Sequence, residues 1–303
     1  IGLIEALKSD EDISQAFLTT HSSNAVESCS AAEIAILANR NGIARCSFVP
    51  EELEGPHRAN PSPFLARSII VVEGQTEEGL YRAFAEYHDK IARAEGNPTL
   101  AAQGVCICQG NGGAHAVSKA IGFASLGYKV ALLVDADDSD TNNKLESATQ
   151  SGVHIFTWPN GWSTESAIFD ALEKEQISQL LEFIADEEIV PRERISSNFS
   201  SNGLGTFDPS SPGTCWLGRP EEDVRKKLVA SASKASANRK GWFKSISASI
   251  ELGKWLIDAV AQSDRLMQSN LRKTYHALLR SHYLAPPLIL RRKSVEQCMV
   301  CFA

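Results

Sequence analysis

The sequence predicts an α/β fold in which a parallel four-stranded sheet is flanked by helices and followed by a helical region. Four short runs rich in β-branched residues are separated by stretches with helical periodicity, and beyond about residue 163 only the helical pattern continues. Strands that alternate with helices form βαβ units, in which the strands run parallel and the helices cover both faces. The composition of the 303 residues, 43% apolar and 22% charged, excludes a disordered, collagen-like or disulfide-scaffold protein.

Residues 1–65 precede the alternating pattern and are expected to form short elements. We expect a helix over about 2–9, an extended apolar run at 16–20 and a helical patch at 31–37. A loop rich in proline and charge follows at 50–63.

The four predicted strands are continuous apolar runs, which is typical of strands buried on both faces of a sheet. They cover residues 68–73, 104–109, 129–135 and 153–158, with helices at 77–94 and 114–126 and a polar helix before the last strand. Further helices are expected at 163–184, 220–233 and 242–262, with a loop rich in Ser, Asn and Gly at 196–213.

Acidic side chains gather where the first and third strands end. Glu73 ends the first strand, and Glu77 lies in the first turn of the next helix. Asp135 and Asp137 end the third strand and, two residues apart in extended backbone, point the same way. Functional groups of parallel sheets collect at this edge, and clustered carboxylates suit Mg²⁺ or Mn²⁺. Each motif alone could be a helix cap or a turn, but together they favour a metal site.

Charge is divided unevenly along the chain, whose formal net charge is −7. Residues 1–190 hold 12 basic and 28 acidic side chains, whereas residues 191–303 hold 18 basic and 9 acidic ones. The basic part suits a polyanionic partner such as nucleic acid, although a plain solvated surface explains it equally well.

The cysteines, the apolar runs and the first residues of the chain indicate the cellular compartment that we expect. Seven cysteines, an odd number without regular spacing, indicate a reducing compartment, so we expect a cytoplasmic protein. No apolar run approaches the roughly 20 residues that span a bilayer. The chain opens without an initiator Met or a signal peptide, so we expect a part of a longer protein.

Two segments together resemble the Toprim domain, the Mg²⁺ site shared by topoisomerases, DnaG-type primases and several nucleases. They are residues 70–77 (IVVEGQTE) and 132–137 (LLVDAD). A topoisomerase would need a further domain with a nucleophilic Tyr, and a primase a zinc module, and this chain has room for neither. Residues 16–22 (AFLTTHS) resemble the last strand and switch-histidine loop of an ABC-type ATPase head. An ATPase head followed directly by a Toprim domain is the layout of the OLD (overcoming lysogenization defect) nucleases, which include the Gabija-type antiphage defence nucleases.

The resemblance implies the roles of individual residues. Glu73, Glu77, Asp135 and Asp137 would hold one or two Mg²⁺ or Mn²⁺ ions, and Ser163 and Glu165 would complete the second site. Residues 241–244 (GWFK) resemble the segment with the family's catalytic Lys, which is Lys244 here. Two metal ions would stabilise both oxygens of an in-line phosphodiester displacement, and Lys244 would offset charge in the transition state. The alternative for Lys244 is an exposed position on an amphipathic helix.

The implied function is a divalent-metal-dependent DNA endonuclease that self-associates, with a helicase partner if it is Gabija-type. The implied domains are residues 1–65 as the end of the ATPase head, 66–190 as the Toprim catalytic domain and 191–303 as a helical, basic region completing the nuclease. Two alternatives remain open: a non-catalytic, nucleic-acid-binding Toprim module, and a receiver-like phosphotransfer domain with Asp135 as the acceptor. No phosphate-binding Gly-x-x-x-x-Gly-Lys-Ser/Thr motif occurs, so we expect this chain not to bind ATP.

Overall fold

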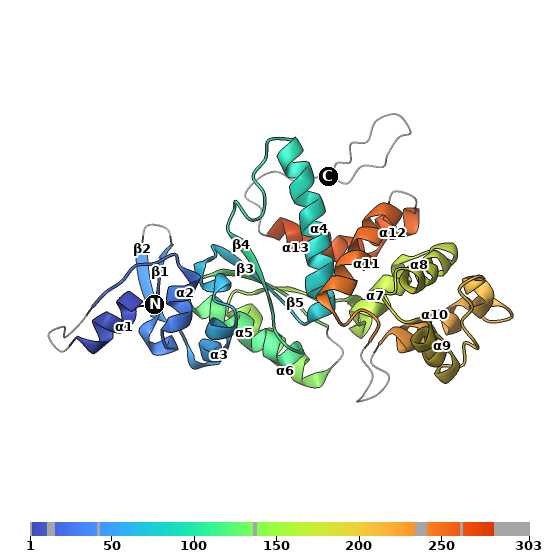
Figure 1. Cartoon of the computed structure of the whole chain (residues 1–303), viewed down its shortest axis with the longest axis horizontal. Helices are drawn as coiled ribbons and strands as arrows, with labels where there is room; N and C mark the ends of the chain where they lie inside the picture. Colours follow the sequence, from blue (N-terminus) through green and yellow to red (C-terminus); the bar gives the residue numbers. More distant parts are fainter. Residues whose placement is uncertain are drawn as a thin grey trace.

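The computed structural model describes residues 2–10, 16–40, 43–135, 138–233, 241–260 and 263–281. Figure 1 shows a central sheet with an N-terminal group of short elements on one side and a helical region on the other. The sheet contains four parallel strands in the spatial order β4-β3-β5-β6. They are β3 (Ser68–Val72), β4 (Val105–Gln109), β5 (Lys129–Leu133) and β6 (His154–Phe156). The predicted α/β class and the four parallel strands are therefore confirmed, with each strand one to three residues shorter than expected.

The strand β3 lies in the middle of the sheet and is buried along its whole length. Its residues alternate between two hydrophobic cores, because successive side chains of a strand point to opposite faces. Ile70 and Val72 belong to the core that contains Leu80 of the helix α4 (Gln75–Ala94). Ile69 and Val71 belong to the core that contains Phe123 of the helix α5 (Gly113–Ser125). A continuous apolar run is thus what a strand covered on both faces requires.

Three crossover helices connect the strands: the first covers one face of the sheet, and the other two cover the opposite face. They are α4 (Gln75–Ala94), α5 (Gly113–Ser125) and α6 (Ser139–Gln150). Helix α4 packs closely along α11 (Ile246–Val260), as Figure 1 shows. Glycines permit this approach: a Cβ added to Gly79 would lie 2.4 Å from Ser249 Cβ, and one added to Gly253 would lie 2.5 Å from Ala83 Cβ.

The region after β6 is helical, as predicted, but more finely divided. Its helices are α7 (Thr164–Ala171), α8 (Lys174–Asp186), α9 (Arg192–Ser201), α10 (Glu221–Ala232), α11, α12 (Asp264–Gln268) and α13 (Asn270–Ser281), with a short 3₁₀ turn η5 (Pro212–Trp216). The single helix expected over 163–184 is wrong, because Leu172 is extended and separates α7 from α8. The loop expected over 196–213 is wrong in its first part, which belongs to α9.

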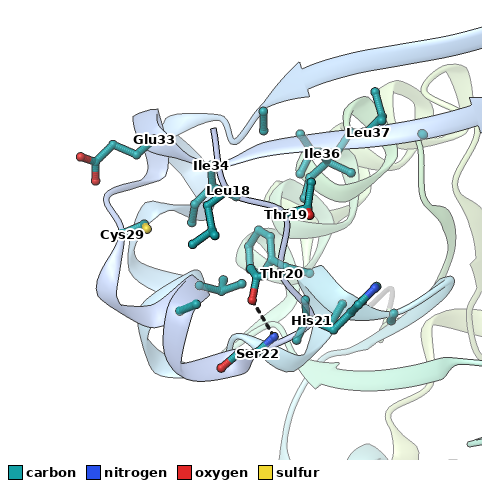
Figure 2. A pocket seen from close by; sticks show the side chains of 18 of the residues that line it. Leu18, Thr19, Thr20, His21, Ser22, Cys29, Glu33, Ile34, Ile36 and Leu37 are labelled. Atoms are coloured by element: carbon teal, nitrogen blue, oxygen red, sulfur yellow. Dashed lines mark hydrogen bonds between the residues drawn. The ribbon is translucent and has the colours of Figure 1, made fainter. Parts of the chain in front are cut away.

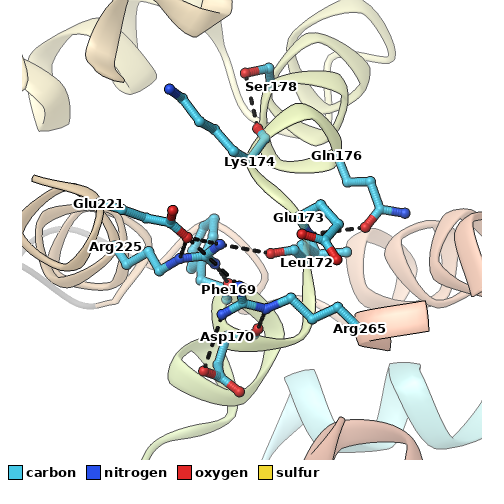
Figure 3. Close-up of polar contacts among 10 residues, drawn as sticks. All are labelled: Phe169, Asp170, Leu172, Glu173, Lys174, Gln176, Ser178, Glu221, Arg225 and Arg265. Carbon is cyan, nitrogen blue, oxygen red and sulfur yellow. Dashed lines mark hydrogen bonds and ion pairs between the residues drawn. The ribbon is translucent and has the colours of Figure 1, made fainter. Parts of the chain in front are cut away.

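Two arginines hold the end of α7, where helix carbonyls lack partners within the helix. Arg225 of α10 donates to the carbonyls of Phe169 and, at 3.0 Å, Leu172. Arg265 of α12 donates to the carbonyl of Asp170 at 2.7 Å. Figure 3 shows both guanidinium groups converging on this turn from different helices. The end of α7 is therefore bound to the helical region by charge-assisted hydrogen bonds.

The helix expected over about 2–9 is confirmed by α1 (Gly2–Ser9), but the other N-terminal elements differ from the sequence prediction. They are α2 (Ser23–Ser28), η1 (Ala31–Glu33), the antiparallel strands β1 (Ala35–Arg40) and β2 (Ile43–Phe48), η2 (Glu51–Leu53), α3 (Glu54–Ala59) and η3 (Ser62–Leu65). The helical patch expected over 31–37 is wrong beyond Glu33, because Ile34 and Ile36 pack on the core while Ala35 and Leu37 are exposed. That alternation has the period of a strand. The loop expected over 50–63 is also wrong, since short helices occupy most of it.

A pocket lies beside this hairpin, where residues 16–22 approach β1. Its lining includes Leu18, Thr20 and His21, and Figure 2 shows the Ser22 N–H donating to Thr20 Oγ1, at 3.0 Å. The large apolar side chains of Leu37, Ile43 and Phe48 are exposed on the hairpin. Within the part of the chain that the structure describes, no helix is both long enough and apolar enough to cross a bilayer.

Candidate metal centre

The backbone of Glu73 is fixed at the carboxyl end of β3 by β5 on one side and by the turn after β4 on the other. Its N–H donates to Leu133 O of β5 at 3.0 Å, and its carbonyl accepts from the Gly112 N–H at 3.1 Å. Gly112 has φ of 113°, in the left-handed region that favours glycine, so the turn after β4 can fold back onto β3. The side chain of Glu73 lies toward β5, where its Oε2 accepts from the Asp135 N–H at 2.9 Å. Glu73 and Asp135 are therefore side by side.

Glu77 lies in the first turn of α4 and is only 2% exposed. Its Oε2 accepts from the Gly74 N–H at 2.9 Å, which satisfies a backbone donor at the start of the helix. The positive end of the helix dipole also stabilises a carboxylate at this position. A capping residue is thus held, nearly buried, beside the end of β3.

Asp135 follows β5 and is 8% exposed. Its Oδ1 accepts from the Thr164 hydroxyl at 3.3 Å, and the Thr164 Oγ1 accepts from Trp158 Nε1 at 3.0 Å. Thr164 opens α7, and Trp158 lies just beyond β6. The predicted partner of Asp135, Asp137, lies outside the described residues. Its neighbour Asp138 caps α6 by accepting from the Thr141 N–H at 2.8 Å, and its hydrogen bonds from Thr141 lower the pKa of Asp138.

The first turn of α7 carries the other two predicted ligands. Ser163 is the N-cap residue, and its hydroxyl accepts from the Ser166 N–H at 3.3 Å. Glu165 is 2% exposed, and its Oε1 lies 3.2 Å from Lys244 Nζ. The structure therefore brings Lys244 and Glu165 together, although they are far apart in the sequence.

Lys244 is partly buried among carboxylates. Burial disfavours its charged form, but the negative charges of Glu165, Glu77 and Asp135 outweigh burial and raise the pKa of the ammonium above its ordinary value. Lys244 is therefore protonated at neutral pH, and the negative charges of all three acids act on it. As the alternative for Lys244 expects, its side chain is 40% exposed and Trp242 and Phe243 are buried, but Lys244 precedes α11 and does not lie on it.

One backbone carbonyl fixes the segment that carries Lys244. Phe243 O accepts from Ser249 Oγ of α11 at 2.6 Å and from Thr76 Oγ1 of α4 at 3.1 Å. Both hydroxyl residues are fully buried. Since Thr76 is adjacent to Glu77, the same turn of α4 positions a carboxylate and the lysine segment.

The donor set fits a divalent cation. Glu73, Glu77, Asp135 and Glu165 supply only carboxylate oxygens, which Mg²⁺ and Mn²⁺ prefer, and Lys244 supplies a single compensating charge. Across the described ranges, which lack Asp137, no three His, Cys, Asp or Glu side chains already converge as an ion would hold them.

Several residues around the centre were not singled out from the sequence. They are Thr76, Trp158, Thr164, Ser249 and Tyr275. Tyr275 of α13 is buried, and burial together with the charges of Glu77 and Asp135 raises its pKa well above the ordinary value, so the phenol stays protonated. Its hydroxyl donates to Glu77 O at 3.4 Å. No sequence pattern marks these residues, because each acts through a contact that depends on how the chain packs; only Thr76 and Thr164 stand next to predicted ligands.

Comparison with known proteins agrees with the fold. Residues 64–137 match the family described as the overcoming lysogenization defect protein-like TOPRIM domain. No curated protein matches the chain. A solved structure of the C-terminal region of the OLD protein of Xanthomonas campestris pv. campestris is 17% identical, with a TM-score of 0.34, over 73% of this chain and 98% of that one. The assignment rests on the family match, whose residues contain β3, β4, β5 and the acids that follow them. The chain therefore contains a TOPRIM domain of the OLD-like family.

Proposed function

We propose that this chain is a divalent-metal-dependent DNA endonuclease, the nuclease part of an OLD-like protein. The observation that carries the proposal is the position of Lys244 beside Glu165, within the field of Glu77 and Asp135. A TOPRIM domain is a nuclease- or primase-type fold, and its acids occupy the sheet edge where functional groups of parallel sheets collect.

The roles of the residues follow from their charge and position. Glu73, Glu77 and Asp135 would hold a first Mg²⁺ or Mn²⁺ ion together with Asp137, and Ser163 and Glu165 would hold a second. When bound, such ions activate water and stabilise the attacking and leaving oxygens of a phosphodiester displacement. Lys244, protonated at neutral pH, would stabilise negative charge that develops on the phosphate; it is not suited to accept a proton.

A second candidate is a TOPRIM module that binds nucleic acid without cutting it. Each carboxylate described here already has a partner within the protein: Glu73 accepts from Asp135 N–H, Glu77 accepts from Gly74 N–H, and Glu165 pairs with Lys244. A site satisfied in this way is also what a non-catalytic module would show.

Cleavage of supercoiled plasmid with Mg²⁺ or Mn²⁺ separates the two candidates. We expect metal-dependent cleavage by the wild type and at least a 100-fold loss in Glu73→Ala and Lys244→Ala, which is the order of magnitude for removing one charge-stabilising donor. The matched controls are Lys254→Ala and Glu182→Ala, which remove exposed charges elsewhere and should cut like the wild type. Wild-type protein that binds DNA but does not cleave it under either metal would favour the binding module.

A further inference from the structure

A buried chain of hydrogen bonds ends on Asp135. It begins at the indole of Trp158, whose side chain is almost fully enclosed. Trp158 Nε1 donates to Thr164 Oγ1 at 3.0 Å, and Thr164 Oγ1 donates to Asp135 Oδ1 at 3.3 Å. All three residues are buried, so water does not compete for these bonds.

The chain has a fixed direction. An indole N–H can only donate, so the Thr164 oxygen must be the acceptor of that bond. A hydroxyl has one hydrogen, and with Trp158 on its lone pair, Thr164 directs this hydrogen to Asp135. The carboxylate of Asp135 therefore meets a donor of defined orientation and not a rotating hydroxyl.

The same residue joins the two groups of predicted ligands. Thr164 lies between Ser163 and Glu165 in the first turn of α7, and its hydroxyl reaches the acid that follows β5. On the other side, Glu73 accepts from the Asp135 backbone N–H. Asp135 is thus held at its backbone by β3 and at its carboxylate by α7.

We propose that Thr164 is a positioning residue that fixes the Asp135 carboxylate for a divalent cation, and that Trp158 sets the direction of its hydrogen bond. The proposal rests on the proposed function, since it concerns the same metal centre. It assigns Thr164 no contact with the cation or the substrate. Partners that orient a ligating carboxylate commonly change metal affinity by about 10- to 100-fold when they are removed.

The experiment is Mn²⁺ binding to the full chain, measured by titration calorimetry for the wild type, Thr164→Val, Thr164→Ser and Trp158→Phe. Thr164→Val keeps the shape but loses the hydroxyl, and we expect it to bind Mn²⁺ about 10-fold more weakly. Thr164→Ser keeps the hydroxyl and should restore binding. Trp158→Phe loses the donor that sets the direction and should weaken binding in the same sense, by less.

The matched control is Ser231→Ala. This residue is also fully buried, and its hydroxyl donates to Lys227 O at 2.8 Å within the helical region. It should lower the melting temperature without changing Mn²⁺ affinity, which separates a loss of stability from a loss of positioning. Should Thr164→Val fail to fold, the comparison of Trp158→Phe with Ser231→Ala decides the question.

The outcomes distinguish the two proposals. Wild-type protein that binds no Mn²⁺ would overturn the proposed function together with this inference. If the wild type binds Mn²⁺ and folded Thr164→Val binds it equally well, only the positioning role of Thr164 is overturned. Weaker binding in Thr164→Val that Thr164→Ser does not restore would also count against it.

Discussion

The two faces of the sheet are covered in different ways, although both are apolar. One face packs against α5, α6 and the N-terminal elements through side chains such as Phe64, Phe123 and Leu132. The other packs against α4 and against helices that residues 164–281 supply, and its core includes Trp158, Phe243 and Tyr275. These last residues, or their immediate neighbours, are the ones that position Asp135, Lys244 and Glu77.

The two faces of the sheet therefore have different roles. The side chains on the face covered by α5 only support the sheet. Those on the face covered by α4, α7 and α11 also position the residues of the candidate metal centre. A substitution on the second face should therefore affect stability and the metal centre together, and one on the first face stability alone. The following predictions compare matched substitutions on this basis.

The largest effect is expected from Gly79→Ala at the contact between α4 and α11. The new Cβ would lie 2.4 Å from Ser249 Cβ and 2.6 Å from Ile246 O, so backbone must shift. We expect a loss of about 3 kcal/mol in the free energy of unfolding, the upper part of the range for overpacking, with a loss of cleavage. The measurements are urea unfolding and plasmid cleavage.

Gly122→Ala on the other face is the control for that prediction. Its Cβ would lie 3.1 Å from Cγ of the buried Leu53, so that side chain need shift by only a few tenths of an ångström, and alanine favours the helix. Stability should change by less than about 1 kcal/mol and cleavage should be retained. Equal losses in the two variants would contradict the division between the faces.

A smaller loss of stability is expected from removing the two hydroxyl groups that donate to Phe243 O. Thr76→Val and Ser249→Ala each leave one donor, so each alone should cost about 1 kcal/mol. The double variant leaves a buried carbonyl without a partner, so its cost should exceed the sum of the single costs. Cleavage should fall with it, because Lys244 follows the released carbonyl. Strictly additive unfolding free energies, from a double-mutant cycle, would argue against a shared acceptor.

An effect smaller than that of this double variant is expected from Arg225→Met, at the far end of α7 from Glu165. It removes the hydrogen bonds to Phe169 O and Leu172 O and should cost about 1.5 kcal/mol in unfolding free energy. Arg192→Met breaks only an exposed pair with Asp186 and should cost less than about 1 kcal/mol. Thermal unfolding of both variants tests which of them loses more stability. A larger loss in Arg192→Met would show that α7 does not depend on the Arg225 hydrogen bonds drawn in Figure 3.

The sequence predicted the sheet well because local pattern determines it. The run at 68–73 is apolar and β-branched throughout, which is what a strand between two cores requires. The hairpin of β1 and β2 was missed because the apolar residues of 31–37 match a helical pattern as well as an alternating one, and only packing of Ile34 and Ile36 decides between them.

The candidate site was predictable in part. The positions of Glu73 and Asp135 at strand ends, and of Glu77 in the helical turn that follows, were predicted from the pattern, whereas Ser163, Glu165 and Lys244 came from a family resemblance. Their roles as metal ligands and catalyst remain predictions. The contact of Trp158 with Thr164 depends on how the turn η4 (Pro159–Gly161) folds, and that of Thr76 with Phe243 on how two distant segments pack. Neither leaves a periodic signal in the chain.

The most direct test of the central claim is the anomalous scattering of Mn²⁺ in crystals of this chain. The account predicts an anomalous peak at the carboxyl edge of the sheet, bounded by Glu73, Glu77 and Asp135, and loss of that peak in Glu77→Gln. A peak absent from this edge at saturating Mn²⁺, or unchanged in Glu77→Gln, would contradict the assignment of these acids as a metal centre.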